Sequence, residues 1–135
     1  MSHYSVIDTR IASGKHLVRA LQDMGFHEVE IHAEAQPLIG WLGDSRESRA
    51  HIIVRREQVG AASNDIGFFQ TPGGYFQARI SDFDRVLFGK KWLDGLTQRY
   101  SYHVATDLLA ERGFETVAEG RDRDGTVRLT LRRMA

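Results

Sequence analysis

The sequence contains no cysteine, which excludes disulfides, thiolate metal sites, iron–sulfur clusters and a cysteine nucleophile. It has only 2 prolines, and no run approaches the roughly 18 apolar residues that indicate a membrane-spanning helix. Neither sign of charge dominates, because 18 Lys and Arg balance 18 Asp and Glu. The chain therefore lacks the general attraction to nucleic acids and anionic membranes that a basic protein has.

The composition is that of an ordinary globular protein, with 41% hydrophobic and 27% charged residues. A chain of 135 residues has a common size for a single domain, so we expect one domain over residues 1–135. The N-terminus shows no basic segment followed by an apolar run. We therefore expect an intracellular, cytoplasmic protein without a membrane anchor.

Hydrophobic periodicity predicts alternating strands and helices in the first half of the chain. Ser13 is a candidate helix N-cap, and Gly25 supplies a residue that ends helices. Pro37, Gly40 and Gly43 are turn residues and favour a loop. The predicted elements are a strand over 4–11, a helix over 14–24, a strand over 27–34, a loop over 36–48 and a strand over 50–55.

The second half begins with the clearest hairpin signal, two strand-like runs around the turn residues 71–74. In that hairpin Phe69 and Phe76 should lie nearly opposite each other and form a cross-strand aromatic pair. The remaining predicted elements are a long helical region after Asp84 with a break at Gly89 and an end at Arg112, a strand over 115–119, a turn over 122–125 and a strand over 126–133.

An internal similarity suggests the topology. Gly25-Phe26 and Gly113-Phe114 each end a predicted helix and lead into a strand. Two helix–strand units in a small domain favour an antiparallel sheet with two main helices on one face, an α+β sandwich of ferredoxin-like type. The alternative is that two unrelated helices share a common stop signal.

The outward side of the second helix is the best candidate for function. Arg99, Tyr100, His103 and Asp107 lie on it, and His103 and Asp107 are spaced to pair at i, i+4. A carboxylate that orients an imidazole is what acid–base chemistry needs, and an exposed aromatic suggests a contact surface. The alternative is a solvated helix face with a weak ion pair. We expect the opposite side, made of Ser101, Val104, Ala105, Leu108 and Leu109, to face the sheet.

Two further sets of polar residues are weaker candidates for a metal site and a phosphate-binding site. Side chains at i and i+2 of a strand stand nearly 7 Å apart, which is wide for one shared ion, and the C-terminal arginines alternate with acidic residues. We therefore assign no metal and no cofactor, and we expect no nucleic-acid partner. The two sets are Glu28, Glu30, His32 and Glu34, and Arg121, Arg123, Arg128, Arg132 and Arg133.

Four segments taken together resemble a family of small proteins from cyanobacteria, plastid genomes and other bacteria, catalogued as domain of unknown function 1257. These segments are 1–9, 65–68, 96–103 and 124–133. The resemblance implies no established activity. Members are often encoded beside an ATPase of the AAA class, which implies an accessory or adaptor role. The family's paired tryptophans after the central hairpin are absent, since residues 81–84 read Ser-Asp-Phe-Asp and the tryptophan comes at Trp92.

We therefore expect a non-enzymatic interaction or adaptor module with a protein partner, and an AAA-class ATPase is the partner that the resemblance implies. The predicted interaction surface consists of Arg99, Tyr100, His103 and Asp107. The alternative is a small-molecule-binding protein or enzyme in which His103 acts as acid–base and Asp107 orients it. Because no catalytic motif is recognisable, we favour the first hypothesis.

Overall fold

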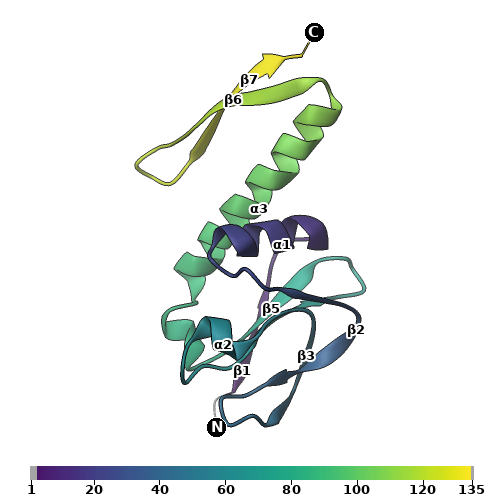
Figure 1. Ribbon diagram of the computed structural model, residues 1–135, viewed down its shortest axis with the longest axis vertical. Coiled ribbons are helices and arrows are strands. Elements are labelled where there is room, and N and C mark those ends of the chain that lie inside the picture. The colour runs from purple at the N-terminus through teal and green to yellow at the C-terminus, as the bar shows by residue number, and fades with distance from the viewer. Residues whose placement is uncertain (1–2, 135) are drawn as a thin grey trace.

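The computed structural model describes residues 3–134, which form a five-stranded antiparallel sheet, two main helices and a separate two-stranded hairpin (Figure 1). The strands are β1 (Tyr4–Asp8), β2 (Glu30–Ile39), β3 (Ser45–Val54), β4 (Ile66–Gln70), β5 (Phe76–Ser81), β6 (Phe114–Arg121) and β7 (Val127–Arg133). The helices are α1 (Gly14–Asp23), the short α2 (Arg56–Val59), the 3₁₀ turn η1 (Asp84–Val86) and α3 (Lys90–Glu111).

The five-stranded sheet has the order β1-β5-β4-β3-β2, so β1 and β2 form its two edges. The chain crosses from one edge to the other through α1 and then returns through β2 to β5 in a meander. Helices α1 and the first half of α3 supply the apolar side chains that cover one face of this sheet. The predicted α+β class, with an antiparallel sheet and two main helices on one face, is confirmed, and this layering is compatible with a ferredoxin-like sandwich.

The main core lies between that face and the two helices. Helix α1 begins as its cap predicts, because the Ser13 hydroxyl accepts the backbone N–H of His16 at 3.4 Å. It ends before Gly25, whose φ of 103° is favourable for glycine alone. The core consists of Ile11, Leu17, Ala20, Leu21, Phe26, Ile52, Val54, Ile66, Phe68, Phe76, Ala78, Ile80, Leu93 and Leu96.

The loop predicted over 36–48 is wrong. Strand β2 continues to Ile39 and β3 already begins at Ser45, so only residues 40–44 connect them. Pro37 is tolerated inside β2 because this strand lies at the sheet edge and its register shifts between Pro37 and Ile39. The turn residues that predicted a loop therefore mark a bulged edge strand and a short turn.

The end of the β2–β3 hairpin packs on the face of the sheet that the helices leave open. Leu38 and Ala50 form a second small core there with Ile53. They lie over Gly67 of β4, where an added Cβ would be 2.5 Å from the Ala50 Cβ and 2.7 Å from Leu38 Cδ2. Glycine is needed at this position because the two layers approach so closely.

The predicted pair of Phe69 and Phe76 is also wrong. The register pairs Phe69 with Gln77, and Phe76 with Gln70, so the two rings lie on opposite faces of the sheet. Phe76 is buried in the main core. Phe69 lies on the open face, where the Arg79 guanidinium sits 4.2 Å from its ring centre.

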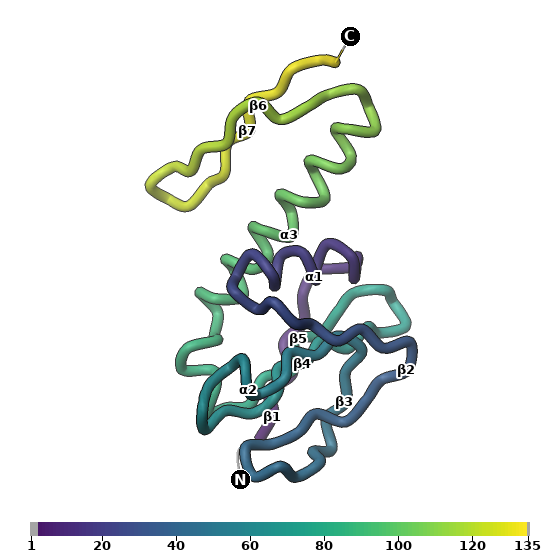
Figure 2. Tube along the Cα trace, viewed as in Figure 1, coloured from purple at the N-terminus to yellow at the C-terminus, as the bar shows by residue number. Residues whose placement is uncertain are grey.

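The second half of α3 extends beyond the sheet and carries the β6–β7 hairpin (Figure 2). The second helix–strand unit thus does not return to the main sheet, since β6 pairs with β7 alone. Between Thr97 and Met134 no residue is fully buried. We call residues 97–134 the C-terminal arm. No helix within residues 3–134 is long and apolar enough to cross a membrane.

Candidate functional site

The four predicted site residues lie on α3, and their side chains contact α1 and the segment that leads into it. The Tyr100 hydroxyl accepts the backbone N–H groups of Ala12 and Ser13 at 3.1 and 3.0 Å. Its ring packs against the edge of the main core. Tyr100 therefore holds the segment that leads into α1, instead of projecting outward as the helical pattern suggested.

Asp107 is paired with α1 and not with His103. Its Oδ2 lies 2.8 Å from His16 Nε2 and 2.9 Å from Arg19 Nη1. The hydrogen bond with His16 holds the pKa of Asp107 below its ordinary value. The i, i+4 pair expected between His103 and Asp107 is absent because α1 supplies a better partner for each.

His103 and Arg99 both contact Asp23 near the end of α1. The distances to Asp23 Oδ2 are 2.6 Å from His103 Nε2 and 2.9 Å from Arg99 Nε. Although burial opposes the shift, these two hydrogen bonds hold the pKa of Asp23 below its ordinary value. Arg99 also donates to Glu119 of β6 at 3.0 Å. Arg99 and His103 thus connect α3 to α1, and Arg99 also connects α3 to the β6–β7 hairpin.

Ser13, His16 and Asp107 form a hydroxyl–imidazole–carboxylate chain that sequence analysis missed. Ser13 Oγ lies 2.6 Å from His16 Nδ1, and these are the residue types of a hydrolytic triad. The Ser13 hydroxyl, however, caps α1, and only a small part of the His16 side chain is exposed. The three residues therefore cap α1 and connect this cap to α3 through Asp107. We assign them no catalytic role.

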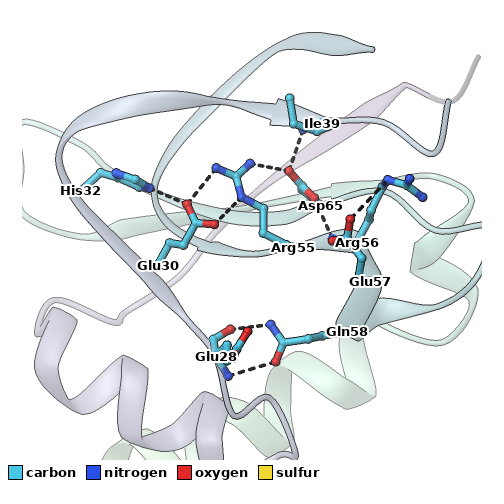
Figure 3. Close-up of polar contacts among 9 residues, drawn as sticks. All are labelled: Glu28, Glu30, His32, Ile39, Arg55, Arg56, Glu57, Gln58 and Asp65. Atoms are coloured by element: carbon cyan, nitrogen blue, oxygen red, sulfur yellow. Dashed lines mark hydrogen bonds and ion pairs between the residues drawn. The ribbon is translucent and has the colours of Figure 1, made fainter. Parts of the chain in front are cut away.

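A second polar network surrounds Arg55 (Figure 3). Its guanidinium donates to both carboxylate oxygens of Glu30, at 2.6 and 2.8 Å, and to Asp65 Oδ2 at 2.7 Å. His32 Nε2 lies 2.8 Å from Glu30 Oε1. The predicted acidic strand face therefore includes two residues, Glu30 and His32, that are engaged within the chain.

Asp65 is the buried centre of this network. It has no exposed surface, and it accepts the backbone N–H groups of Ile39 and Arg56, both at 2.7 Å, besides the Arg55 guanidinium. It thereby joins β2, α2 and β4. A shallow cavity of about 340 Å³ lies beside it. These donors occupy the Asp65 carboxylate with contacts between segments of the fold. The network therefore has a structural role, and we assign it no ligand.

The network predicts an acid-sensitive contribution to stability. The hydrogen bonds from Arg55 lower the pKa of Glu30 to about 2, from an ordinary 4.5. A depressed pKa stabilises the fold fully above pH 4.5, and this contribution is lost as the pH falls toward 2. Because Glu30 is partly exposed, we expect about 1 kcal/mol. Urea unfolding of wild type and Glu30→Gln should differ by this amount at pH 7 and converge near pH 2. An equal difference at both values would contradict this explanation.

A third polar cluster fixes the turn between β5 and α3. Asp84 Oδ2 accepts from the Asn64 backbone N–H at 2.9 Å, from Asn64 Nδ2 at 3.2 Å and from Ser81 Oγ at 2.7 Å. All three residues are buried. Such a fully bonded buried network holds its segment in one conformation.

The same turn exposes three large apolar side chains. Phe83 is 55% exposed, Val86 86% and Leu87 77%. We call these three residues the η1 platform. Sequence analysis missed it because Val86 and Leu87 fit the interior of a longer helix. Val86 and Leu87 are the most exposed large aliphatic side chains among residues 3–134.

A groove of about 530 Å³ lies close to the platform, between β1 and the beginning of α3. Residues Ile7 to Arg10 form one wall. The facing residues are Arg85, Lys90, Leu93, Asp94 and Thr97. The groove is therefore partly apolar, and both cationic and acidic side chains line it.

The C-terminal arginines contact neighbours within the chain. Arg128 Nε is 2.9 Å from Asp122, and Arg132 forms an ion pair with Glu115. Arg121 donates to Gln98 at 2.9 Å, and the Arg133 guanidinium lies 4.9 Å from the Phe114 ring centre. Arg128 and Arg132 are therefore paired with carboxylates, whereas Arg121 and Arg133 contact neutral side chains.

Comparisons with known proteins agree with the resemblance found in the sequence. The chain is 25% identical over 134 residues to an uncharacterized protein, ycf35, of Cyanophora paradoxa, and 24% identical over 138 residues to ycf35 of Pyropia yezoensis. Each alignment covers 98% of this chain and 98% of the relative. No solved structure matches the chain with significance. The model of the family described as protein of unknown function (DUF1257) matches residues 20–130, and the chain therefore belongs to this family.

Proposed function

We propose that the protein is a non-enzymatic interaction module that binds another protein through the η1 platform. The observation that supports this most directly is the exposure of Phe83, Val86 and Leu87 on a turn fixed by buried Asp84. Apolar surface on a rigid element is typical of a binding site, because little conformational entropy is lost when a partner covers it.

The polar row on α3 has a supporting role in this proposal. Arg99, Tyr100, His103 and Asp107 fix α3 on α1 and contact β6. They would orient the C-terminal arm relative to the platform, so that one partner can contact both. We propose in addition that residues 1–135 form a single folding domain and that the protein is located in the cytoplasm. An AAA-class ATPase, which the family resemblance implies, is the first partner to test.

Affinity purification of the tagged full-length chain from its native cells, followed by mass spectrometry, tests the proposal. We expect a stoichiometric protein partner with wild type. The double variant Val86→Ser/Leu87→Ser should lose that partner by at least tenfold, because it replaces the most exposed apolar surface of the platform. Its melting temperature should stay within a few degrees of wild type, since both side chains lie outside the core.

Ile31→Ser/Leu42→Ser is the matched control. These two aliphatic side chains are 66% and 65% exposed, and they lie on β2 and in the β2–β3 turn, outside the platform. Leu42 follows Trp41, whose backbone N–H donates to Asn64 at 3.1 Å, so the control includes an exposed apolar side chain from a segment that contacts the same buried cluster. The control should retain the partner. Retention of the partner by both double variants, or its loss from both, would reject the platform as the binding surface.

A further inference from the structure

The two edges of the five-stranded sheet differ in how well they are protected from pairing with another strand. Edge strand β2 contains Pro37 and two register shifts, features that discourage edge pairing. Edge strand β1 contains no proline, and its register with β5 is continuous from Tyr4 to Asp8. It thus has the regular backbone that an added strand needs.

The ladder shows which backbone groups of β1 point away from the sheet. Asp82 donates its backbone N–H to the His3 carbonyl at 2.8 Å, so residue 3 faces β5. In an antiparallel ladder alternate residues face the same neighbour. Tyr4, Val6 and Asp8 therefore direct their backbone groups toward the free edge, where no strand of residues 3–134 pairs with them.

The groove between β1 and α3 runs along the last residues of this strand. Its apolar contacts come from Ile7 and Leu93, and its charged lining consists of Arg10, Arg85, Lys90, Asp8 and Asp94. Lys90 pairs with Asp94 at 2.8 Å, whereas Arg10 and Arg85 have no carboxylate within ion-pair distance among residues 3–134. Three cationic and two acidic side chains thus line the groove, and the two guanidinium groups outside any ion pair give it a cationic excess beside an open strand.

We propose, building on the proposed function, that an extended acidic segment of the partner protein adds to β1 as a sixth strand. Its backbone would pair with Val6 and Asp8 at the free edge. Alternate side chains would enter the groove, with apolar ones against Ile7 and Leu93 and carboxylates at Arg10 and Arg85. Strand addition of this kind takes its affinity from main-chain hydrogen bonds and its specificity from alternate side-chain pockets.

The first test selects eight-residue peptides from a random display library against the full chain. We expect recovered peptides in which apolar residues alternate with Asp or Glu, and amide NMR shifts that are largest at Val6 and Asp8. Val6→Pro removes one outward N–H without affecting the β5 ladder, so it should weaken the best peptide at least tenfold. Val6→Ala keeps the N–H and should bind within threefold of wild type. Arg10→Glu/Arg85→Glu should abolish binding of the acidic peptide.

Failure to recover any acidic alternating peptide, or full affinity of the best one for Val6→Pro, would overturn strand addition. Affinity purification of the native partner with each variant distinguishes failure of strand addition from failure of the proposed function. A partner lost from Val86→Ser/Leu87→Ser but retained by Val6→Pro would support the platform and reject strand addition. A partner lost from Val6→Pro alone would support strand addition and reject the platform. Retention by both variants would reject both proposals.

Discussion

Replacing Asp65 with alanine is expected to lower the free energy of unfolding by about 3–5 kcal/mol. The substitution removes the acceptor of two part-buried backbone N–H groups, those of Ile39 and Arg56. It also removes one hydrogen-bond acceptor of the Arg55 guanidinium, which remains paired with Glu30. The cost is large because three donors converge on one carboxylate that has no exposed surface, and all three lose their acceptor together.

Urea unfolding at pH 7 measures this loss. Asp65→Asn should lie between wild type and alanine, because an amide offers one acceptor oxygen where the carboxylate offers two. Asp94→Ala is the control, since it removes an exposed carboxylate that pairs with the exposed Lys90. It should change stability by no more than about 0.5 kcal/mol. If Asp65→Ala behaved like Asp94→Ala, the network around Arg55 would not be a major determinant of stability.

Replacing Asp84 with alanine should cost about 2–4 kcal/mol and also loosen the η1 platform. Asp84 Oδ2 accepts three hydrogen bonds from Asn64 and Ser81, all buried. Without it, the backbone N–H and the side-chain amide of Asn64 lose their common acceptor, Asp84 Oδ2. The turn before α3 is then attached to Ser81 only through the backbone N–H of residue 84. The backbone N–H groups of Leu87 and Phe88 donate to the Asp84 carbonyl at 3.2 and 2.8 Å, so local loosening should expose both to solvent exchange.

Denaturant unfolding gives the global loss, and hydrogen exchange at Leu87 and Phe88 gives the local one. The exchange of these two amides should accelerate more than that of the α1 amides, which belong to an element that Asp84 does not contact. Ser81→Ala is an informative second variant. It removes the hydroxyl that donates to Asp84 Oδ2 and accepts from Asn64 Nδ2 and the Asp84 backbone N–H. It leaves the charged Asp84 carboxylate bonded to Asn64, and hydrogen bonds to a charged group are the stronger ones. It should show a smaller effect of the same kind. Unchanged exchange in Asp84→Ala would mean that the platform is rigid without the buried cluster.

Helix α1 and strands β4 and β5 could be predicted because their signals are local. Ser13 and Gly25 bound the helix in the sequence as they do in the structure, and the turn residues 71–74 separate β4 from β5. The break at Gly89 is also confirmed, since η1 precedes it and α3 begins at Lys90. In each case the residues that determine the element lie within it or next to it.

The errors arose where a distant segment decided the outcome. Pro37 predicts a loop by its own chemistry, yet Leu38 packs over Gly67 and keeps β2 extended. The charged residues on one side of α3 indicate a solvated face, yet Asp23 and His16 of α1 pair with that side. These partners are more than seventy residues away along the chain, so a local pattern does not reveal them. Helical periodicity places residues on a side of a helix but does not show what covers that side.

The sequence by itself determined the composition-based exclusions, most of the secondary structure, the α+β class and the family. Those properties depend on residue inventory, short-range periodicity and similarity along the chain. Only the tertiary structure showed that Arg99, Tyr100, His103 and Asp107 contact α1, and that Phe83, Val86 and Leu87 remain exposed. Exposure and pairing depend on which distant elements pack against a side chain, and local patterns do not contain that information.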